Sequence, residues 1–452
     1  MVPPETPGSD TAAPTPAEPA PPADPVGAAD TAPGDDAYAR RFGSLLRLPE
    51  FRALWVADTV SVLGDQIMRV AISYLVFTET GSAVASAVVY AMTFLPTLFG
   101  GIVLSGLADR YPRKAVMVVT DLARAALFAL AAIPGIPLPV IAVMVVVAVM
   151  LGSAFRSAQT ATLPDVLAGE LYTTGLAFRS ISLQTAQLLG YGVGGLVAGT
   201  LGPRWGLLLD AATFVLSAIL LAVRVRPRPV PPRERVHESR WKDYGHGIGE
   251  GLRLIGRDPR LRLLLGLALM SSFYVIPEGL APPYAAQFGG GGIATGLLMA
   301  ADPAGSAIGA WLLVKCVPPD LQRRWMAVLS VGPGLVLLVC WFGPGLPGSL
   351  VVWAVAGVLS VFQIPASVEF VRLVPDNQRG VALGLVTSAM LTAQGLGVVV
   401  GGIVAGFTSA VTAIGATGAA GVLAGAYLAV RWRALQAEQE APRDAHGSHR
   451  AG

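Results

Sequence analysis

Long apolar runs alternate with short polar segments over most of this chain of 452 residues. A run such as LPVIAVMVVVAVMLGSAF (138–155) is about as long as a helix needs to cross roughly 30 Å of hydrocarbon. Inside lipid, every backbone amide has to be hydrogen-bonded within its own segment, so these runs have to be helices. The short alternating segments of a transmembrane β-barrel do not occur. The pattern therefore predicts an all-α membrane protein.

The pattern predicts twelve transmembrane helices, six on either side of a basic segment. The expected spans are 52–77, 83–105, 115–133, 138–158, 173–199, 205–223, 261–280, 293–316, 326–344, 349–371, 381–405 and 411–431. This division predicts a disordered Pro/Ala-rich tail (1–42), an N-terminal six-helix bundle (43–223), a basic linker with a surface helix (224–260), a C-terminal six-helix bundle (261–432) and a disordered tail (433–452).

The two halves repeat each other at a fixed separation of 211 residues. Three pairs of identical residues have this separation: Asp109 and Asp320, Asp165 and Asp376, Gly190 and Gly401. Internal duplication, with the binding site at the interface of the repeats, is typical of secondary transporters. We therefore expect two pseudo-symmetric bundles.

Composition supports a membrane location, since 53% of the residues are hydrophobic, 13% are charged and the mean hydropathy is +0.61. The basic residues gather in alternate loops, and the segment 224–262 is the richest. Because basic loops stay in the cytoplasm, both termini are expected there. Arginine is far commoner than lysine, beside much Ala and Gly, which is typical of a GC-rich bacterial gene. The bacterial plasma membrane is the expected location.

A charged segment, SGLADRYPRKAVMVV (105–119), separates the second and third spans. Asp109 ends the second span, and Arg110, Arg113 and Lys114 follow it. The carboxylate can meet the positive N-terminal end of a neighbouring helix, and the bases can pair across the seam between the bundles. Such contacts form in one access state and break in the other, so they set the balance between the two states. The alternative is a loop that only obeys the positive-inside bias.

This segment resembles the signature G-x-L-A-D-R-x-G-R-R/K between helices 2 and 3 of the major facilitator superfamily, with Ser105 and Pro112 in place of its glycines. The stretch FRALWVADTVSVLGDQIMRVAISYLVFTETGS is similar to the siderophore-exporter and macrolide-efflux branch. LGYGVGGLVAG (189–199) resembles the exporters' glycine-rich signature, with Tyr191 where proline is usual. The resemblance covers 43–432. It implies a monomer in which the eleventh span, beginning near Gly380, is the neighbour of Asp109.

Ionisable residues inside the spans are candidates for substrate or proton binding, because a charge at mid-bilayer costs about 3 kcal/mol or more. Asp58, Asp65 and Arg69 share one face of the first span, and Arg69 is one turn from Asp65, with which we expect it to pair. Further candidates are Asp302 and Glu369, then Asp210 and Glu278. A self-satisfied ion pair that fixes helix packing is the alternative for the first group.

Small-xxx-small spacing marks the fifth and eleventh spans. The main positions are Gly190, Gly194, Gly195 and Gly401. Such spacing lets two helix backbones approach closely, so these glycines are expected to be packing positions. A role in flexing or in sealing against leaks is the alternative.

The sequence contains no P-loop, zinc-protease or nucleophile-elbow motif, so we expect neither an enzyme nor a cofactor or metal site. A proton-coupled exporter of a small amphipathic molecule, such as a drug, siderophore or secondary metabolite, is the main hypothesis. The expected partners are this substrate, protons and membrane lipids, and nucleic acid is not expected. An importer or facilitator of the same fold, or a membrane sensor or scaffold that transports nothing, stays open.

Overall fold

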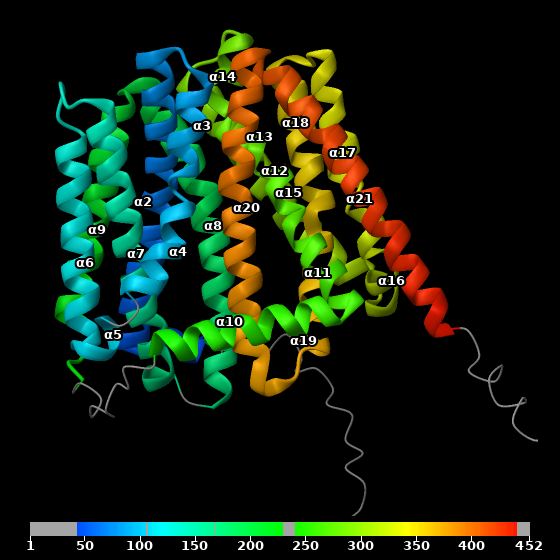
Figure 1. Ribbon diagram of the computed structural model, residues 1–452. Coiled ribbons are helices and arrows are strands. Elements are labelled where there is room, and N and C mark those ends of the chain that lie inside the picture. Colours follow the sequence, from blue (N-terminus) through cyan, green and yellow to red (C-terminus); the bar gives the residue numbers. More distant parts are fainter. Residues whose placement is uncertain (1–42, 105–106, 168, 229–239, 441–452) are drawn as a thin grey trace, which may run out of the picture.

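The computed structural model describes residues 43–104, 107–167, 169–228 and 240–440. Across these ranges helices follow one another with short connections, and none of the residues is in a β-strand (Figure 1). The prediction of an all-helical chain is confirmed. The predicted N-terminal tail lies outside the described residues.

The N-terminal half consists of helices that pack mainly on one another, with α2 against α8 and α9, and α6 against α7 and α9. Their bounds are α2 (Pro49–Thr80), α3 (Ala83–Ala91), α4 (Leu95–Leu104), α5 (Leu107–Arg110), α6 (Arg113–Ala131), α7 (Leu138–Val166), α8 (Glu170–Thr200) and α9 (Pro203–Arg224). Gly81 ends α2 in the left-handed conformation at φ 64°, and the Ser82 hydroxyl then caps α3 by accepting from the Ala85 amide.

The C-terminal half contains more and shorter helices. Their bounds are α11 (Pro259–Leu269), α12 (Ser271–Tyr274), α13 (Ile276–Gly279), α14 (Ala281–Gln287), α15 (Gly292–Cys316), α16 (Pro319–Leu329), α17 (Gly332–Leu337), η1 (Leu338–Phe342), α18 (Gly345–Leu359), η2 (Ser360–Phe362), α19 (Gln363–Leu373), η3 (Asp376–Gln378), α20 (Arg379–Phe407) and α21 (Ala410–Glu440). The last helix continues past the predicted boundary at residue 432.

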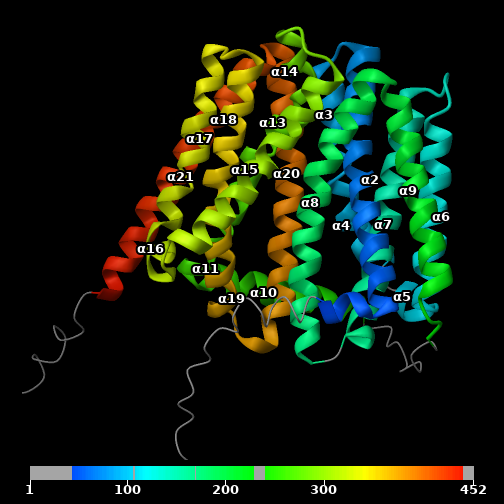
Figure 2. The same ribbon diagram turned by 180° about the vertical axis from the view of Figure 1, so that it is seen from behind.

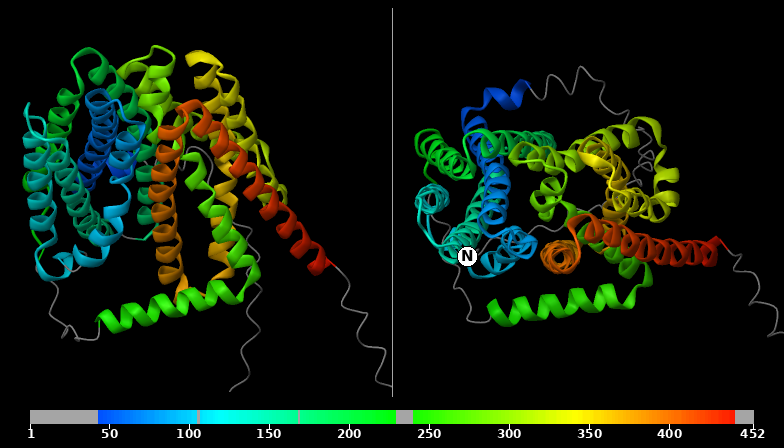
Figure 3. Two further views of the ribbon diagram at one scale, coloured as in Figure 1. Left: turned by 45° about the horizontal axis from the view of Figure 1, so that its top comes forward. Right: turned by 90° about the horizontal axis from the view of Figure 1, so that it is seen from above.

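Helix α10 (Arg240–Arg257) lies across one end of the other helices rather than alongside them (Figures 1 and 3). We call this end the linker end and the opposite one the far end. Gly251 of α10 contacts the Leu385 and Val381 side chains of α20, so α10 rests on the C-terminal half. The view from behind shows the N-terminal half on one side of the molecule and the C-terminal half on the other (Figure 2).

Prolines account for several of the helix breaks. Pro277 and Pro282 lie in the first turns of α13 and α14, and Pro333 lies in the first turn of α17. Since proline lacks the amide hydrogen and clashes with the preceding turn, it starts a helix well but does not continue one. The break between α16 and α17 bends the chain by 43°.

Every expected span falls on a helix or a chain of short helices. Among the described residues, eight helices are long and apolar enough to cross a membrane, or nine if the bent pair at 319–342 is one span. The shortfall lies where α3 and α4 are separated, in α6, which carries four charged residues, and in α8, whose apolar run is diluted by Gln, Ser, Thr and Gly. Twelve spans in two bundles of six therefore stay a prediction.

The two halves touch through small residues between the middle and the far end. A Cβ atom added to Gly195 of α8 would lie 2.6 Å from the Gly296 Cα of α15, and one at Gly199 would lie 2.8 Å from the Ile293 amide nitrogen. On the other side of the seam, Gly402 of α20 contacts Ala87 of α3. The glycines thus allow a backbone approach that any side chain would prevent.

The contact between α8 and α15 can be tested with two glycines of one helix. Both Gly195→Ala and Gly192→Ala add helix propensity, worth about 1 kcal/mol in a helix interior. Only the first adds a methyl group against a neighbouring backbone, since nothing lies within 4 Å of a Cβ at Gly192. Overpacking costs about 1–3 kcal/mol, so we expect Gly195→Ala to lower the melting temperature of the purified protein relative to Gly192→Ala. Equal melting temperatures would contradict this contact.

Candidate functional site: a polar cavity between the halves

A cavity of about 370 Å³ lies between the two halves and draws its walls from both. Its charged and amide-bearing wall residues are Arg69, Gln184, Gln187, Glu278, Asp302, Gln363 and Gln394. Phe94, Tyr191 and Tyr274 add aromatic side chains, and serines and aliphatic residues make up the rest of the wall. The exposed Gln184 shows that the cavity is not sealed. Charged, amide and hydroxyl groups thus make up much of the wall, with aromatic and aliphatic surface between them, and the size suits a small organic ligand.

Glu278 of α13 is the centre of a hydrogen-bond cluster that joins the two halves. Its Oε2 atom accepts from the Tyr90 hydroxyl of α3 and, at 3.1 Å, from the Tyr191 hydroxyl of α8. The two hydroxyl oxygens are 3.3 Å apart. Tyr90 and Tyr191 are fully buried and Glu278 is 6% exposed. Of the hydrogen bonds between described side chains, these alone connect the halves.

The two predicted candidates that reach the cavity differ in their surroundings. The Arg69 guanidinium lies 5.0 Å from the Phe94 ring centroid, and it donates to Gln66 Oε1 at 3.3 Å. It also interacts electrostatically with Glu278. Asp302 of α15 is half-buried, and no hydrogen bond or ion pair reaches its side chain from the described residues. The carboxylate of Glu278 lines the same cavity, and it repels the carboxylate of Asp302 when both are ionised.

A second group of charges is enclosed within the N-terminal half. Arg124 Nη2 of α6 donates to Asp65 Oδ1 at 2.6 Å, and its Nη1 lies 3.9 Å from Asp121 Oδ1. The Ser217 hydroxyl of α9 donates to Asp121 Oδ2 at 2.6 Å. The guanidinium also lies 3.8 Å from the Phe214 ring centroid. Arg124 is therefore the cation that makes these buried carboxylates tolerable.

The expected pairing of Asp65 with Arg69 is wrong. Although both residues lie on one helix face, Arg124 of α6 bonds to Asp65, and Arg69 turns to Gln66 and Phe94. Arg124 pairs with Asp65 because its buried guanidinium lies beside Asp65 and Asp121 and has no bulk water to bond with.

The remaining candidates lie away from the cavity. Asp58 accepts from Arg179 Nε of α8 at 2.6 Å, and Glu369 of α19 pairs with Arg323 at 3.0 Å. Asp210 of α9 is fully buried and accepts from the Thr213 hydroxyl at 3.4 Å.

In the charged segment at 105–119, Arg113 binds within its own half. Its Nη1 donates to the Ala161 carbonyl at 2.6 Å and to Asp165 Oδ2 at 2.8 Å, both in α7. The expected pairing across the seam is therefore not made by Arg113. Lys114 is half-buried and Arg110 is exposed. The side chain of Asp109 lies outside the described residues.

The predicted glycines pack on neighbouring helices. A Cβ at Gly190 would lie 2.7 Å from Gln66 Cβ, and one at Gly194 would lie 3.0 Å from Ile67 Cα, both of α2. Gly195 meets Gly296 across the seam, and Gly401 contacts Ile276.

Sequence reasoning missed several members of the site. Asp121 and Arg124 are three residues apart within one apolar span, and Arg179 lies within another. Scanning every span for ionisable residues would have found these three. Tyr90 carried no such signal, since a tyrosine in an apolar run is ordinary and its role depends on Glu278, 188 residues away.

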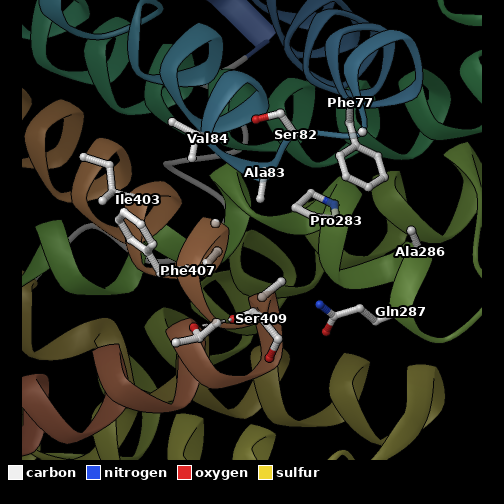
Figure 4. Close-up of a pocket in the computed structure, with 15 residues that line it drawn as sticks. Phe77, Ser82, Ala83, Val84, Pro283, Ala286, Gln287, Ile403, Phe407 and Ser409 are labelled. Atoms are coloured by element: carbon white, nitrogen blue, oxygen red, sulfur yellow. Dashed lines mark hydrogen bonds between the residues drawn. The ribbon is translucent and has the colours of Figure 1, made fainter.

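A second cavity, of about 570 Å³, lies at the far end where α2, α3, α14, α20 and α21 meet (Figure 4). Phe77, Ser82, Pro283, Gln287 and Phe407 are among its wall residues. None of the described residues around it is ionisable, and this separates it from the charged cavity. Among the described residues, no group of His, Cys, Asp or Glu could hold a metal ion.

A polar cavity between two sets of apolar helices defines a membrane transport protein. The family model of the Major Facilitator Superfamily matches residues 54–318, more than half of the chain, and the chain belongs to this superfamily. Its transporters are not enzymes.

Curated relatives agree with this assignment. The multidrug efflux pump Tap of Mycobacterium tuberculosis (strain ATCC 25618 / H37Rv) is 28% identical over 376 residues, which is 79% of this chain and 87% of that protein. Macrolide efflux protein A of Streptococcus pyogenes is 28% identical over 231 residues, covering 50% and 56%. These relatives support a place in the efflux branch of the superfamily.

Solved structures share the fold. A POT family transporter in complex with a thioalcohol conjugated peptide has a TM-score of 0.66 at 9% identity, covering 84% of this chain and 95% of that chain. A bacterial homolog of the human lysosomal transporter Spinster has a TM-score of 0.65 at 15% identity, covering 90% and 99%.

The role of Arg124 can be separated from that of surface ion pairs. Removing one partner of a buried pair typically costs about 3–5 kcal/mol, so Arg124→Gln should strongly lower the melting temperature of the purified protein. Adding Asp65→Asn and Asp121→Asn to Arg124→Gln should restore most of the loss, because no carboxylate is then left unpaired. The control is Arg204→Gln, which breaks a pair with Glu79 that is 24% and 40% exposed and should cost little. If the triple variant is no more stable than Arg124→Gln, the pairing is not what matters.

Proposed function

We propose that this protein is a secondary active exporter of small amphipathic molecules that works by alternating access and exchanges its substrate for protons. The observation that carries the proposal is a carboxylate-bearing cavity between the halves, with the tight contacts between the halves on its far-end side. We further propose twelve spans in two pseudo-symmetric bundles of six, a monomer in the bacterial plasma membrane, and surrounding lipids as its remaining partners.

Orientation follows from charge. Arg110, Arg113, Arg323 and Arg324 belong to α5, the start of α6 and α16, at the same end of the helices as α10. Because basic residues are retained in the cytoplasm, we place the linker end on the cytoplasmic side and expect both termini there. The contacts of Gly195 and Gly402 then close the outer side, and the cavity opens to the cytoplasm. This is the state that an exporter needs for loading.

Glu278 is proposed as the proton carrier. It lies at the seam, where its surroundings change when the halves move apart. Enclosing an ionised carboxylate costs far more than enclosing a protonated one, so protonation favours the closed, dry cluster with Tyr90 and Tyr191. Ionisation favours separation of the halves and entry of water. A proton taken up outside would thus return the empty transporter to the cytoplasm-facing state.

The charged segment at 105–119 is proposed as a second element that sets the balance between the states. The ion pair of Arg113 with Asp165 fixes the start of α6 on α7, and Arg228 Nε also lies 3.6 Å from Asp165 Oδ2. This arrangement supports a rigid linker end of the N-terminal half, against which the other half can move. The partner of Asp109 remains the predicted eleventh span, α20.

Proton coupling can be tested by efflux from cells of a pump-deficient host, loaded with a panel of dyes, macrolides and siderophores. Wild type should lower the accumulation of at least one compound, and a protonophore should abolish this effect. Glu278→Gln should reduce the rate at least about a hundredfold, the lower end of what a positioned proton-transfer group contributes. Glu79→Gln, which alters an exposed carboxylate at the far end, should export normally.

Two results would count against this function. Efflux that survives the protonophore would indicate a facilitator or another coupling ion. No change across the whole panel, with the protein present in the membrane, would favour a sensor or scaffold.

The tyrosines give a graded version of the same test. Tyr90→Phe and Tyr191→Phe each remove one hydroxyl from Glu278 and leave the ring in place. We expect both variants to fold, and to show a proton-driven efflux rate between those of wild type and Glu278→Gln. The check is the initial efflux rate as a function of external pH. Wild-type rates in both variants would mean that the cluster only packs.

A further inference from the structure

Asp302 stands apart from the other carboxylates inside the helices. Those at positions 58, 65, 121, 210, 278 and 369 each have a hydrogen-bond or ion-pair partner on the protein. Within the described ranges, no such partner reaches Asp302. An unpaired charge removed from bulk water is costly, so a carboxylate left without a partner signals that its partner is not part of the protein.

The surroundings of Asp302 identify the charge of this missing partner. Arg69 is the one basic residue in the cavity wall among those described, and it is already engaged with Phe94, Gln66 and the charge of Glu278. Arg69 makes no hydrogen bond or ion pair with Asp302, so among the described residues the negative charge of Asp302 has no positive partner within contact distance. A ligand with a single positive charge would balance it.

The rest of the cavity limits the shape of this ligand. Gln187, Gln363 and Gln394 supply amides, while Phe94 and Tyr274 supply aromatic surface. The cavity volume of about 370 Å³ is within the range of sites for drug-sized molecules. Walls that combine aromatic surface with amides and an unpaired carboxylate suit an amphipathic body that carries one cationic group.

We infer that Asp302 is the residue that binds the positive charge of the substrate, and that the substrates are amphipathic organic cations. The inference rests on the proposed transport function and adds the substrate class to it. Asp302 is then a specificity-determining residue, whereas Glu278 carries the proton.

Binding can be measured without transport. The full-length protein in lipid nanodiscs is dialysed to equilibrium against tetraphenylphosphonium, a cation, and in parallel against triphenylphosphine oxide, a neutral molecule of similar shape. Wild type should bind the cation more tightly than the neutral probe. Asp302→Asn should raise the Kd of the cation at least about tenfold, or about 1.4 kcal/mol, and change that of the neutral probe less than about twofold.

Two variants make the result specific. Asp302→Glu keeps the charge and should retain the preference for the cation. Asp320→Asn removes a carboxylate of the same half that is exposed at the start of α16, and it should bind both probes as wild type does. Neutral-probe binding by Asp302→Asn shows at the same time that this variant is folded.

The inference is overturned if wild type does not prefer the cation, as when a proton is the sole occupant of Asp302. It is also overturned if Asp302→Asn keeps the cation affinity, or if Asp302→Asn and Asp302→Glu lose both probes alike, which would make the residue a packing element. Charge-selective binding at Asp302 without efflux from cells would contradict the proposed transport function and leave the inference about Asp302 standing. Proton-driven efflux without charge-selective binding would contradict the role of Asp302 and leave the proposed transport function standing.

Discussion

A carboxylate buried among helices needs a partner, and this constraint organises the whole charged interior of the protein. In the N-terminal half the partner is a cation, since Arg124 serves Asp65 and Asp121, and Arg179 serves Asp58. Breaking such a pair would leave a buried charge without a partner, and this free-energy cost holds the helices in place relative to one another. In the seam the partners are hydroxyl groups from the opposite half, which can be exchanged for water when the halves separate. Under the proposed alternating access, the fixed partners would hold the N-terminal half as a rigid body, and the exchangeable partners would let the seam open.

The contact of Glu278 with Tyr90 and Tyr191 depends on the glycines beside Tyr191. Tyr191 lies between Gly190 and Gly194 on α8, and these two glycines bring α8 against α2. Gly195, one turn after Tyr191, brings α8 against α15 of the other half. Tyr191 can therefore reach Glu278 because the backbone next to it lies within contact distance of both neighbours. A bulkier residue at any of the three glycine positions would move the hydroxyl away from the carboxylate. Packing and proton chemistry are thus parts of one arrangement.

The sequence predicts the helices and the close-packed glycines well, because length, apolarity and small-residue spacing are properties of single segments. Helical breaks near Pro277, Pro282 and Pro333 are also local, and the break near Pro333 decides whether 319–342 counts as one span. Partner choice is different. Whether Asp65 meets Arg69 or Arg124 depends on the rotation of α2 against α6, which no single segment encodes. For the same reason the role of Tyr90 became visible only when Glu278 was found beside it.

Two carboxylates in one cavity give a physical basis for exchange. Glu278 and Asp302 repel each other when both are ionised. An organic cation on Asp302 cancels this repulsion, which makes release of the proton from Glu278 easier. By linkage, a proton on Glu278 weakens cation binding by the same factor by which the cation weakens proton binding. When Glu278 is protonated, Asp302 feels one negative neighbour fewer, so the cation loses part of the field that holds it. Under the proposed function, the substrate and the proton would therefore weaken each other's binding without sharing a residue, as an exchanger requires of its two sites.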